Sequence, residues 1–295
     1  MAGPPDIYLS SLPSLLGPPS PAGAAPDVAR LATPAVLALI PRSRRQKALR
    51  IRPPGDRARS LAASLMLREV LDVRDDDDLV FGPAGRPGLS PKKLRDLGAD
   101  RLSFSISHSG DWVALAVGGP APLGVDVEKR RREPVPPSLL KRTLSPEELL
   151  ALPEPGPFAF IRVWTLKEAL AKALGLGLTL PLDSFSVWPP SAGVVRILSR
   201  DWRLRSYLLD PDPGPAAPDS AGNAAAVAEG GIVELGGSGT AARAEPGGTC
   251  LSLAVQIPDG GGGGGHDGDG DNDENAAPAF VRLDGRLKKL LAEAG

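Results

Sequence analysis

Residues 160–175 constrain the fold of this chain more than any other stretch. At about 100° per residue, the apolar side chains of this stretch gather on one face, and Glu168 and Lys172 stand one turn apart on the other. Gly175 predicts the C-terminal end, because glycine tolerates the left-handed backbone found there. The pattern predicts an amphipathic helix over 160–174. On the helix alone, Glu168 and Lys172 indicate only a solvent-exposed ion pair worth a few tenths of a kcal/mol.

A short upstream strand, residues 123–128, changes that interpretation. Successive side chains of a strand point to opposite faces, so Asp126 and Glu128 share one face while the intervening valines occupy the other. Acids in this spacing are often merely exposed, but here Glu168 can add a third carboxylate if the helix packs beside the strand. Three carboxylates that leave positions for water and phosphate suit Mg²⁺. The sequence therefore predicts a magnesium site formed by Asp126, Glu128 and Glu168.

Two motifs carry a resemblance to a known family: Gly124-Val-Asp-Val-Glu-Lys129 and Trp164-Thr-Leu-Lys-Glu-Ala-Leu-Ala-Lys172. In this order and spacing they resemble the paired motif of the 4′-phosphopantetheinyl transferase superfamily, and in particular its long, surfactin-synthetase-activating (Sfp-like) branch. Residues 104–109 and 178–187 are also similar to segments of that branch. The resemblance covers roughly residues 40–210 and a last strand near 250–257.

The resemblance implies an α+β fold of two pseudo-symmetric halves, each an antiparallel sheet packed on a long helix, with the active site in the cleft between them. The helices near 57–70 and 160–174 would be the equivalent pair. The expected divisions are an N-terminal half at 1–120, a C-terminal half at 121–258, and a Gly/Asp-rich tether with a short helix at 259–295.

The implied activity is transfer of the 4′-phosphopantetheine arm of coenzyme A to a serine of an apo acyl-, peptidyl- or aminoadipate-reductase carrier, releasing adenosine 3′,5′-bisphosphate. Mg²⁺ would be the cofactor. Lys172 would stabilise the charge on the leaving phosphate, and Lys167 would extend from the edge of the apolar face toward the phosphates. Either Glu168 or a metal-bound water would deprotonate the serine. In the family, an acid at the position of Glu148 also lies near the metal site. Here the capping box that Glu148 forms with Ser145 is the preferred explanation of this residue.

Residues 42–68 hold nine Lys and Arg but a single acid, Asp56, which is predicted to cap a helix over 58–70. Such clusters are usually solvated faces, yet this concentration of cations in a nearly neutral chain indicates a local positive field. The resemblance implies that this field holds the phosphates of coenzyme A. The residues carried over as phosphate or coenzyme A contacts are Arg44, Lys47, Arg59, Arg86, Ser107 and His108.

Further strands are predicted at 7–9, 102–107, 112–117, 185–188, 194–198, 202–209 and 251–257. Residues 211–248 are rich in Ala, Gly and Pro and predict a disordered surface insertion containing a brief strand at 232–235. The glycine- and aspartate-rich stretch that follows Pro258 predicts a flexible tether, and the final residues predict an amphipathic helix without a defined docking site. Truncation after Pro258 is therefore expected to cost little stability.

The composition excludes several classes of protein. The net charge of −1 implies neither a nucleic-acid nor a membrane partner, and a single cysteine excludes an internal disulfide framework. No signal peptide or membrane span is predicted, so a cytoplasmic, monomeric enzyme is expected. Two alternatives stay open: a Mg²⁺-dependent hydrolase of pyrophosphate-linked nucleotides, and a non-enzymatic nucleic-acid-binding protein using residues 42–68. The absence of aromatic residues among those cations counts against the second.

Overall fold

Two larger sheets and a small hairpin organise the computed structural model, which describes residues 4–17, 28–130, 133–152, 156–188, 193–209, 232–235, 248–258 and 277–294. The first sheet has the order β11 (Ala279–Arg282), β1 (Asp6–Ser11), β5 (Trp112–Gly118), β4 (Ser103–Ser109). The second has the order β6 (Leu123–Lys129), β10 (Thr249–Gln256), β8 (Arg200–Leu209), β7 (Val194–Ile197), with β9 (Ile232–Glu234) also paired to β8. The hairpin consists of β2 (Leu79–Phe81) and β3 (Pro87–Leu89).

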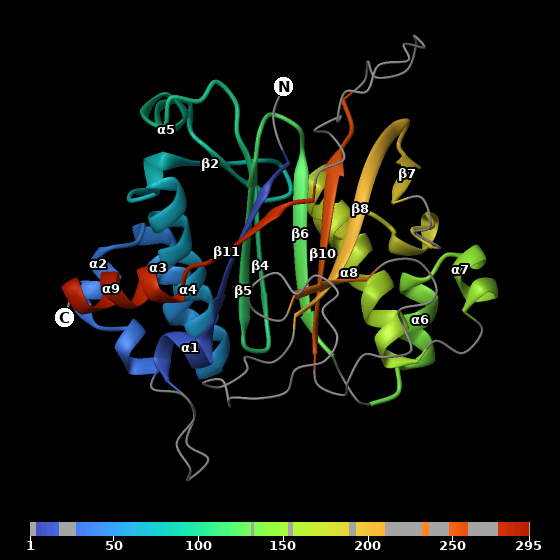
Figure 1. Cartoon of the computed structure of the whole chain (residues 1–295), viewed down its shortest axis with the longest axis horizontal. Helices are drawn as coiled ribbons and strands as arrows, with labels where there is room; N and C mark the ends of the chain where they lie inside the picture. The colour runs from blue at the N-terminus through green and yellow to red at the C-terminus, as the bar shows by residue number, and fades with distance from the viewer. Residues whose placement is uncertain are drawn as a thin grey trace, which may run out of the picture.

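Each larger sheet packs against one long helix, α4 (Pro54–Leu71) on the first and α8 (Pro157–Leu174) on the second. The shorter helices are α1 (Leu12–Leu16), α2 (Pro34–Ala38), α3 (Arg42–Arg50), α5 (Pro91–Asp96), α6 (Pro137–Thr143), α7 (Pro146–Ala151) and α9 (Asp284–Ala294). Single 3₁₀ turns occur at Val28–Leu31, Asp76–Asp78, Gly177–Thr179 and Leu182–Ser184. Figure 1 shows the sheets at the centre, with α1–α4 and α9 on one side and α6–α8 on the other. The predicted α+β class is confirmed.

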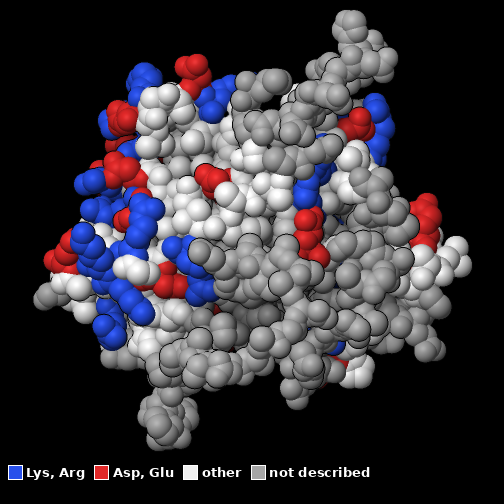
Figure 2. Space-filling view, in the orientation of Figure 1, with Lys and Arg blue, Asp and Glu red and all other residues white. Residues whose placement is uncertain are grey.

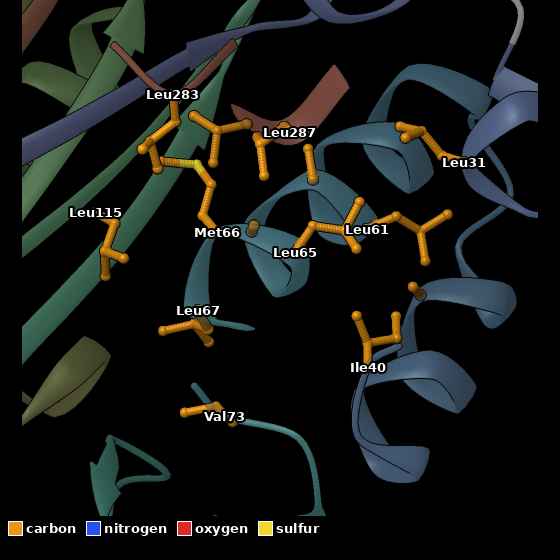
Figure 3. Close-up of a cluster of buried hydrophobic side chains, with 14 of the residues drawn as sticks. Leu31, Ile40, Leu61, Leu65, Met66, Leu67, Val73, Leu115, Leu283 and Leu287 are labelled. Carbon is orange, nitrogen blue, oxygen red and sulfur yellow. The ribbon is translucent and has the colours of Figure 1, made fainter. Parts of the chain in front are cut away.

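Three apolar cores follow from this layering. One lies between the first sheet and its helices, where Met66 of α4 sits beside Leu283 and Leu287 (Figure 3). A second joins α8 to the outer face of the second sheet. The third lies between the two sheets and includes Val125 and Val127 of β6. Fully burying each large aliphatic side chain contributes about 1.5–3 kcal/mol, so the face of β6 opposite the acids fixes that strand firmly.

The elements expected around the site are confirmed. The strand expected at 123–128 is β6, and the hairpin expected across residues 102–117 is β4 and β5. The helix expected at 160–174 is α8, which begins earlier, at Pro157. Gly175 ends it at φ 72°, and its N–H donates to Ala171 and Lys172 carbonyls. Ser145 and Glu148 form the predicted capping box at the start of α7.

Two local predictions are wrong. Residues 185–188 form no strand, because the backbone N–H of Val187 donates to the buried carboxylate of Glu148 (2.8 Å) instead of to a neighbouring strand. Asp56 is not the N-cap of α4, since that helix begins at Pro54 with Pro53 in the cap position. Asp56 lies inside the first turn and forms an ion pair with Arg59.

The C-terminal residues, whose docking the sequence did not define, are an integral part of the first sheet and its helical layer, so the expectation that truncation after Pro258 costs little stability is wrong. Strand β11 pairs in parallel with β1, and α9 packs against α1 and α4. Asp284 accepts hydrogen bonds from the Ser10 hydroxyl (2.8 Å) and the Ser11 N–H (2.9 Å), and Leu283 and Leu287 are fully buried. The division expected at residue 259 would therefore separate residues 277–294 from the sheet to which they belong.

The predicted strand at 232–235 is confirmed as β9, which pairs with β8, and the expected antiparallel pairing of β8 with β10 is also present. Residues 211–231 and 236–247 of the insertion and residues 259–276 of the tether lie outside the described residues. Within the ranges that the structure describes, no helix combines the length and apolar character needed to cross a bilayer.

Candidate active site

Helix α8 packs directly on the backbone of β6 at Gly124. A Cβ atom built there would lie 2.0 Å from the Ala169 carbonyl oxygen and 2.6 Å from the Ala173 nitrogen, both on α8. Real Cβ atoms do not approach backbone atoms so closely, so only glycine permits this contact. The close approach explains the glycine that begins the strand motif. It also brings the acidic face of β6 next to the polar face of α8.

Strand β4 runs beside β6, and its side chains hydrogen-bond the edge of β6 that faces away from β10. Three of the four serines at alternate positions of β4 accept backbone N–H groups of β6: Ser105 from Val125 (3.1 Å), Ser107 from Val127 (3.3 Å) and Ser109 from Lys129 (3.1 Å). A buried N–H without an acceptor is costly, and here serine hydroxyls replace the carbonyls of a neighbouring strand. We call these three residues the serine ladder.

Asp126 is buried and is held by Lys172 and Ser107. Its Oδ1 accepts hydrogen bonds from Lys172 Nζ (2.6 Å) and the Ser107 hydroxyl (2.8 Å), and Lys172 also donates to the Val125 carbonyl (3.2 Å). Its Oδ2 is buried and has no hydrogen-bond partner in the described part of the chain. A buried carboxylate oxygen left without a donor is expensive. The site therefore suits a cation at Oδ2.

Glu128 and Glu168 complete the acidic group. Ser109 donates to Glu128 Oε2 (2.6 Å). Glu168 projects from α8, and its pKa is raised first by burial and then by the negative charge of Asp126; Lys172 opposes the shift and Glu128 adds to it. Asp126 and Glu128 therefore both act electrostatically on Glu168, as expected for carboxylates that lie close enough to share a cation.

The chemistry of these residues fits the predicted magnesium site, but their carboxylates do not converge on one point in this structure. Among the described residues, no group of three or more His, Cys, Asp and Glu side chains is arranged to hold a metal ion. The donor set is nevertheless the hard oxygen set that Mg²⁺ prefers. The unsatisfied Oδ2 of Asp126 and the raised pKa of Glu168 both indicate carboxylates whose negative charge a bound cation would stabilise.

Besides Lys172, two further basic side chains, His108 and Arg59, lie near the end of β4. Arg59 donates to the Gly110 carbonyl (2.5 Å) in the β4–β5 turn, two residues after His108. The pKa of His108 is lowered by loss of water around the ring, then by the charges of Arg59 and Lys172. The side chain of His108 is exposed, so an anion from solution can reach it. An anion bound here would offset the positive charges of Arg59 and Lys172 and would favour the protonated form of His108.

The other expected phosphate contacts have different surroundings. Arg44 donates to the Ser64 hydroxyl (3.0 Å), with a pKa lowered by burial, whereas Lys47 is exposed on α3. Figure 2 shows Lys and Arg side chains gathered on the side of the molecule where α3 and α4 lie. Arg86 donates to the carbonyls of Ala173 (2.6 Å) and Leu123 (3.0 Å), so it braces the β2–β3 loop against α8 and β6.

Two of the residues expected to contact the substrate form hydrogen bonds to other groups of the protein instead. The Ser107 hydroxyl gives its one proton to Asp126, so it has none to offer a phosphate of coenzyme A. Lys167 is fully buried, and its Nζ contacts the carboxylate of Glu148 (2.5 Å) and three carbonyl oxygens, those of Thr143, Leu182 and Phe185. The expectation that Lys167 extends toward the phosphates is wrong in this structure, because burial and these acceptors hold it inside the second core.

Sequence reasoning missed the roles of Ser109 and Gly124. The signal for Ser109 was present, because serines recur at every second residue through β4 and therefore share one face. The pattern did not reveal that this face meets the edge of β6, which is a long-range contact. Gly124 was noted only as a glycine beside the acids, and its collision partners on α8 are visible only in the folded chain.

Comparisons with known proteins identify the family of this chain. A family model described as "4'-phosphopantetheinyl transferase superfamily" matches residues 122–220. A 4'-phosphopantetheinyl transferase of Bacillus subtilis is 33% identical over 188 residues, which is 59% of this chain and 80% of the relative. The 4'-phosphopantetheinyl transferase Sfp of Bacillus subtilis (strain 168) is 33% identical over 189 residues, 60% of this chain and 80% of the relative. The transferase AcpT of Salmonella typhimurium is 34% identical over 123 residues, 40% of this chain and 59% of the relative. The chain therefore belongs to the 4′-phosphopantetheinyl transferase superfamily.

Proposed function

We propose that this protein is a 4′-phosphopantetheinyl transferase that moves the phosphopantetheine arm of coenzyme A to a serine of an apo acyl- or peptidyl-carrier protein. The products are the holo-carrier and adenosine 3′,5′-bisphosphate. Family membership supports the reaction. The observation that carries the site is the buried, unsatisfied Oδ2 of Asp126 beside Lys172 and Glu168.

Asp126, Glu128 and Glu168 would hold Mg²⁺. When bound, this ion would bind the pyrophosphate of coenzyme A and neutralise charge on the leaving phosphate. The chain's own contribution is a rigid support for these acids. The apolar face of β6 is buried between the sheets, the serine ladder closes the edge of the strand, and Gly124 allows α8 to approach.

Glu168 is our candidate for the base that takes the proton of the carrier serine. Burial and the neighbouring acids raise its pKa, which makes its carboxylate a stronger proton acceptor than an ordinary glutamate. Lys172 is our candidate for the group that stabilises charge on the leaving phosphate. Its side chain remains partly exposed, with a relative exposure of 30%, so it can contact substrate while retaining Asp126.

His108 and Arg59 are our candidates for the 3′-phosphate site, with Arg44 and Lys47 contributing from α3. Burial, Arg59 and Lys172 all lower the pKa of His108, and the two positive charges beside the ring support an anion site there. With these contacts, coenzyme A would lie between a half built on α4 and a half built on α8. We infer that the two halves are pseudo-equivalent and that the substrate occupies the cleft between them.

The test is to incubate the protein with coenzyme A, Mg²⁺ and an apo-carrier and to measure the carrier by intact mass spectrometry. Transfer predicts a mass gain of one phosphopantetheine arm and equimolar release of adenosine 3′,5′-bisphosphate. Asp126→Asn preserves the shape of the side chain and should abolish the gain while the protein remains folded. Nucleotide release without a carrier gain would instead identify a hydrolase, and no observation in the structure favours that activity.

A further inference from the structure

The hydroxyl of Ser109 contacts both Glu128 and the backbone that follows it. Its Oγ donates to Glu128 Oε2 (2.6 Å) and accepts the N–H of Lys129 (3.1 Å). A hydroxyl has one proton, so acceptance from the backbone N–H leaves that proton directed at the carboxylate. The orientation of Glu128 is thus set by a residue on another strand. Hydrogen bonds to a charged acceptor of this kind are among the stronger ones in proteins.

Ser107 and Asp126 repeat this arrangement two residues earlier on both strands, but Ser105 does not. Ser107 accepts the N–H of Val127 and donates to Asp126, one residue before it on β6. Ser105 accepts the N–H of Val125 (3.1 Å), but the residue before Val125 is Gly124, which offers no carboxylate. The ladder therefore has two separable roles. All three serines close the edge of β6, and only the last two also orient an acid.

We propose that Ser109 is a positioning residue for the divalent cation, holding Glu128 in the orientation in which its carboxylate binds Mg²⁺. This inference rests on the proposed function and adds a residue to it that neither motif contains. Hydrogen-bond partners that orient metal-binding side chains typically change metal affinity by about 10- to 100-fold when they are removed. Loss of the Ser109 hydroxyl is therefore expected to weaken metal binding without a matching change in coenzyme A binding.

The experiment compares Ser109→Ala with Ser105→Ala, because each removes one hydroxyl that closes the edge of β6 and only the first removes a contact to an acid. Mn²⁺ serves as the probe, and its binding is measured by the electron paramagnetic resonance signal of the free ion during titration. Ser109→Ala should raise the Mn²⁺ Kd about 10-fold, while Ser105→Ala leaves it unchanged within about 2-fold. Ser109→Thr keeps the hydroxyl and should restore most of the affinity. The melting temperature of each variant is recorded alongside.

In the transfer assay, Ser109→Ala should need about 10-fold more Mg²⁺ for half-maximal rate, with KM for coenzyme A unchanged within about 2-fold. Wild-type affinity for Mn²⁺ in Ser109→Ala would overturn the inference. Equal weakening in Ser105→Ala, or no recovery in Ser109→Thr, would also overturn it, because the effect would then come from the edge of the strand. Mn²⁺ binding that depends on Ser109 in a protein unable to modify any carrier would refute the proposed function and leave this inference supported.

Discussion

Replacing either of the two motif lysines on α8 should impair the protein, but for different reasons. Lys172 lies at the acidic group and is partly exposed, whereas Lys167 is enclosed in the second core. Burial lowers the pKa of Lys167 and the buried Glu148 carboxylate opposes that shift, so the ammonium group is retained by its partner. We predict that Lys167→Met acts on stability and Lys172→Met acts on the chemical step.

The size of the Lys167→Met effect follows from what the substitution leaves behind. The carboxylate of Glu148, which also accepts the N–H groups of Ser145 and Val187, becomes a buried charge without a counter-ion. Breaking a buried pair in this way typically costs about 3–5 kcal/mol. For a protein of this size, roughly 2–4 °C is lost per kcal/mol, so the melting temperature should fall by about 6–20 °C.

The assay is thermal unfolding by circular dichroism, together with steady-state transfer well below each melting temperature. The folded fraction of Lys167→Met should keep a kcat within about 3-fold of wild type, because the side chain touches no substrate. Adding Glu148→Gln should recover about 1–3 kcal/mol, because glutamine carries no charge, although its single amide oxygen can accept only one of the two backbone N–H groups. A Lys167→Met protein that melts within 2 °C of wild type and loses kcat 10-fold or more would refute the reasoning. It would place Lys167 at the phosphates after all.

Three further predictions follow from the site and its supports. The ring of His108 should titrate below its ordinary pKa in the free protein and at a higher pH once coenzyme A is bound, as measured by proton NMR. His108→Ala should also lose the preference for coenzyme A over 3′-dephospho-coenzyme A, and an unchanged preference would contradict the phosphate assignment. Gly124→Ala should cost about 3 kcal/mol or more in denaturant unfolding, whereas Gly156→Ala, at the N-cap of α8 with nothing within 4 Å of its Cβ, should cost no more than about 1 kcal/mol. Truncation after Pro258 should give insoluble protein, because it removes β11 and the fully buried Leu283 and Leu287; soluble, folded protein at wild-type yield would contradict the docking of this segment.

Local pattern was sufficient to predict the elements that present the acids. Alternation identified β6, helical periodicity identified α8, and the Ser145–Glu148 capping box identified the start of α7. Each of these signals depends on residues within a few positions of one another. They predict which side chains share a face, and so Asp126 and Glu128 were paired correctly on one side of the strand.

What the sequence could not supply were contacts between distant segments. The position of Lys167 near the edge of an apolar stripe is compatible with exposure or burial, and the choice depends on Glu148 and on the carbonyls that surround it. The expected strand at 185–188 failed for the same reason, because Glu148 takes the N–H of Val187. The C-terminal helix gave a clear amphipathic pattern, but the pattern carries no information about which surface receives it.

The parallel pairing of β11 with β1 also sets the order in which the protein can be completed during synthesis. The first sheet receives an edge strand and part of its helical cover from residues 277–294, which are translated after every element of the second sheet. At roughly 5–20 residues per second, the interval between β5 and β11 is on the order of ten seconds or more. During that interval the open edge of β1 is available for wrong pairing. The first sheet, which contains the first strand to be synthesised, therefore cannot be completed until the strands of the second sheet have been made.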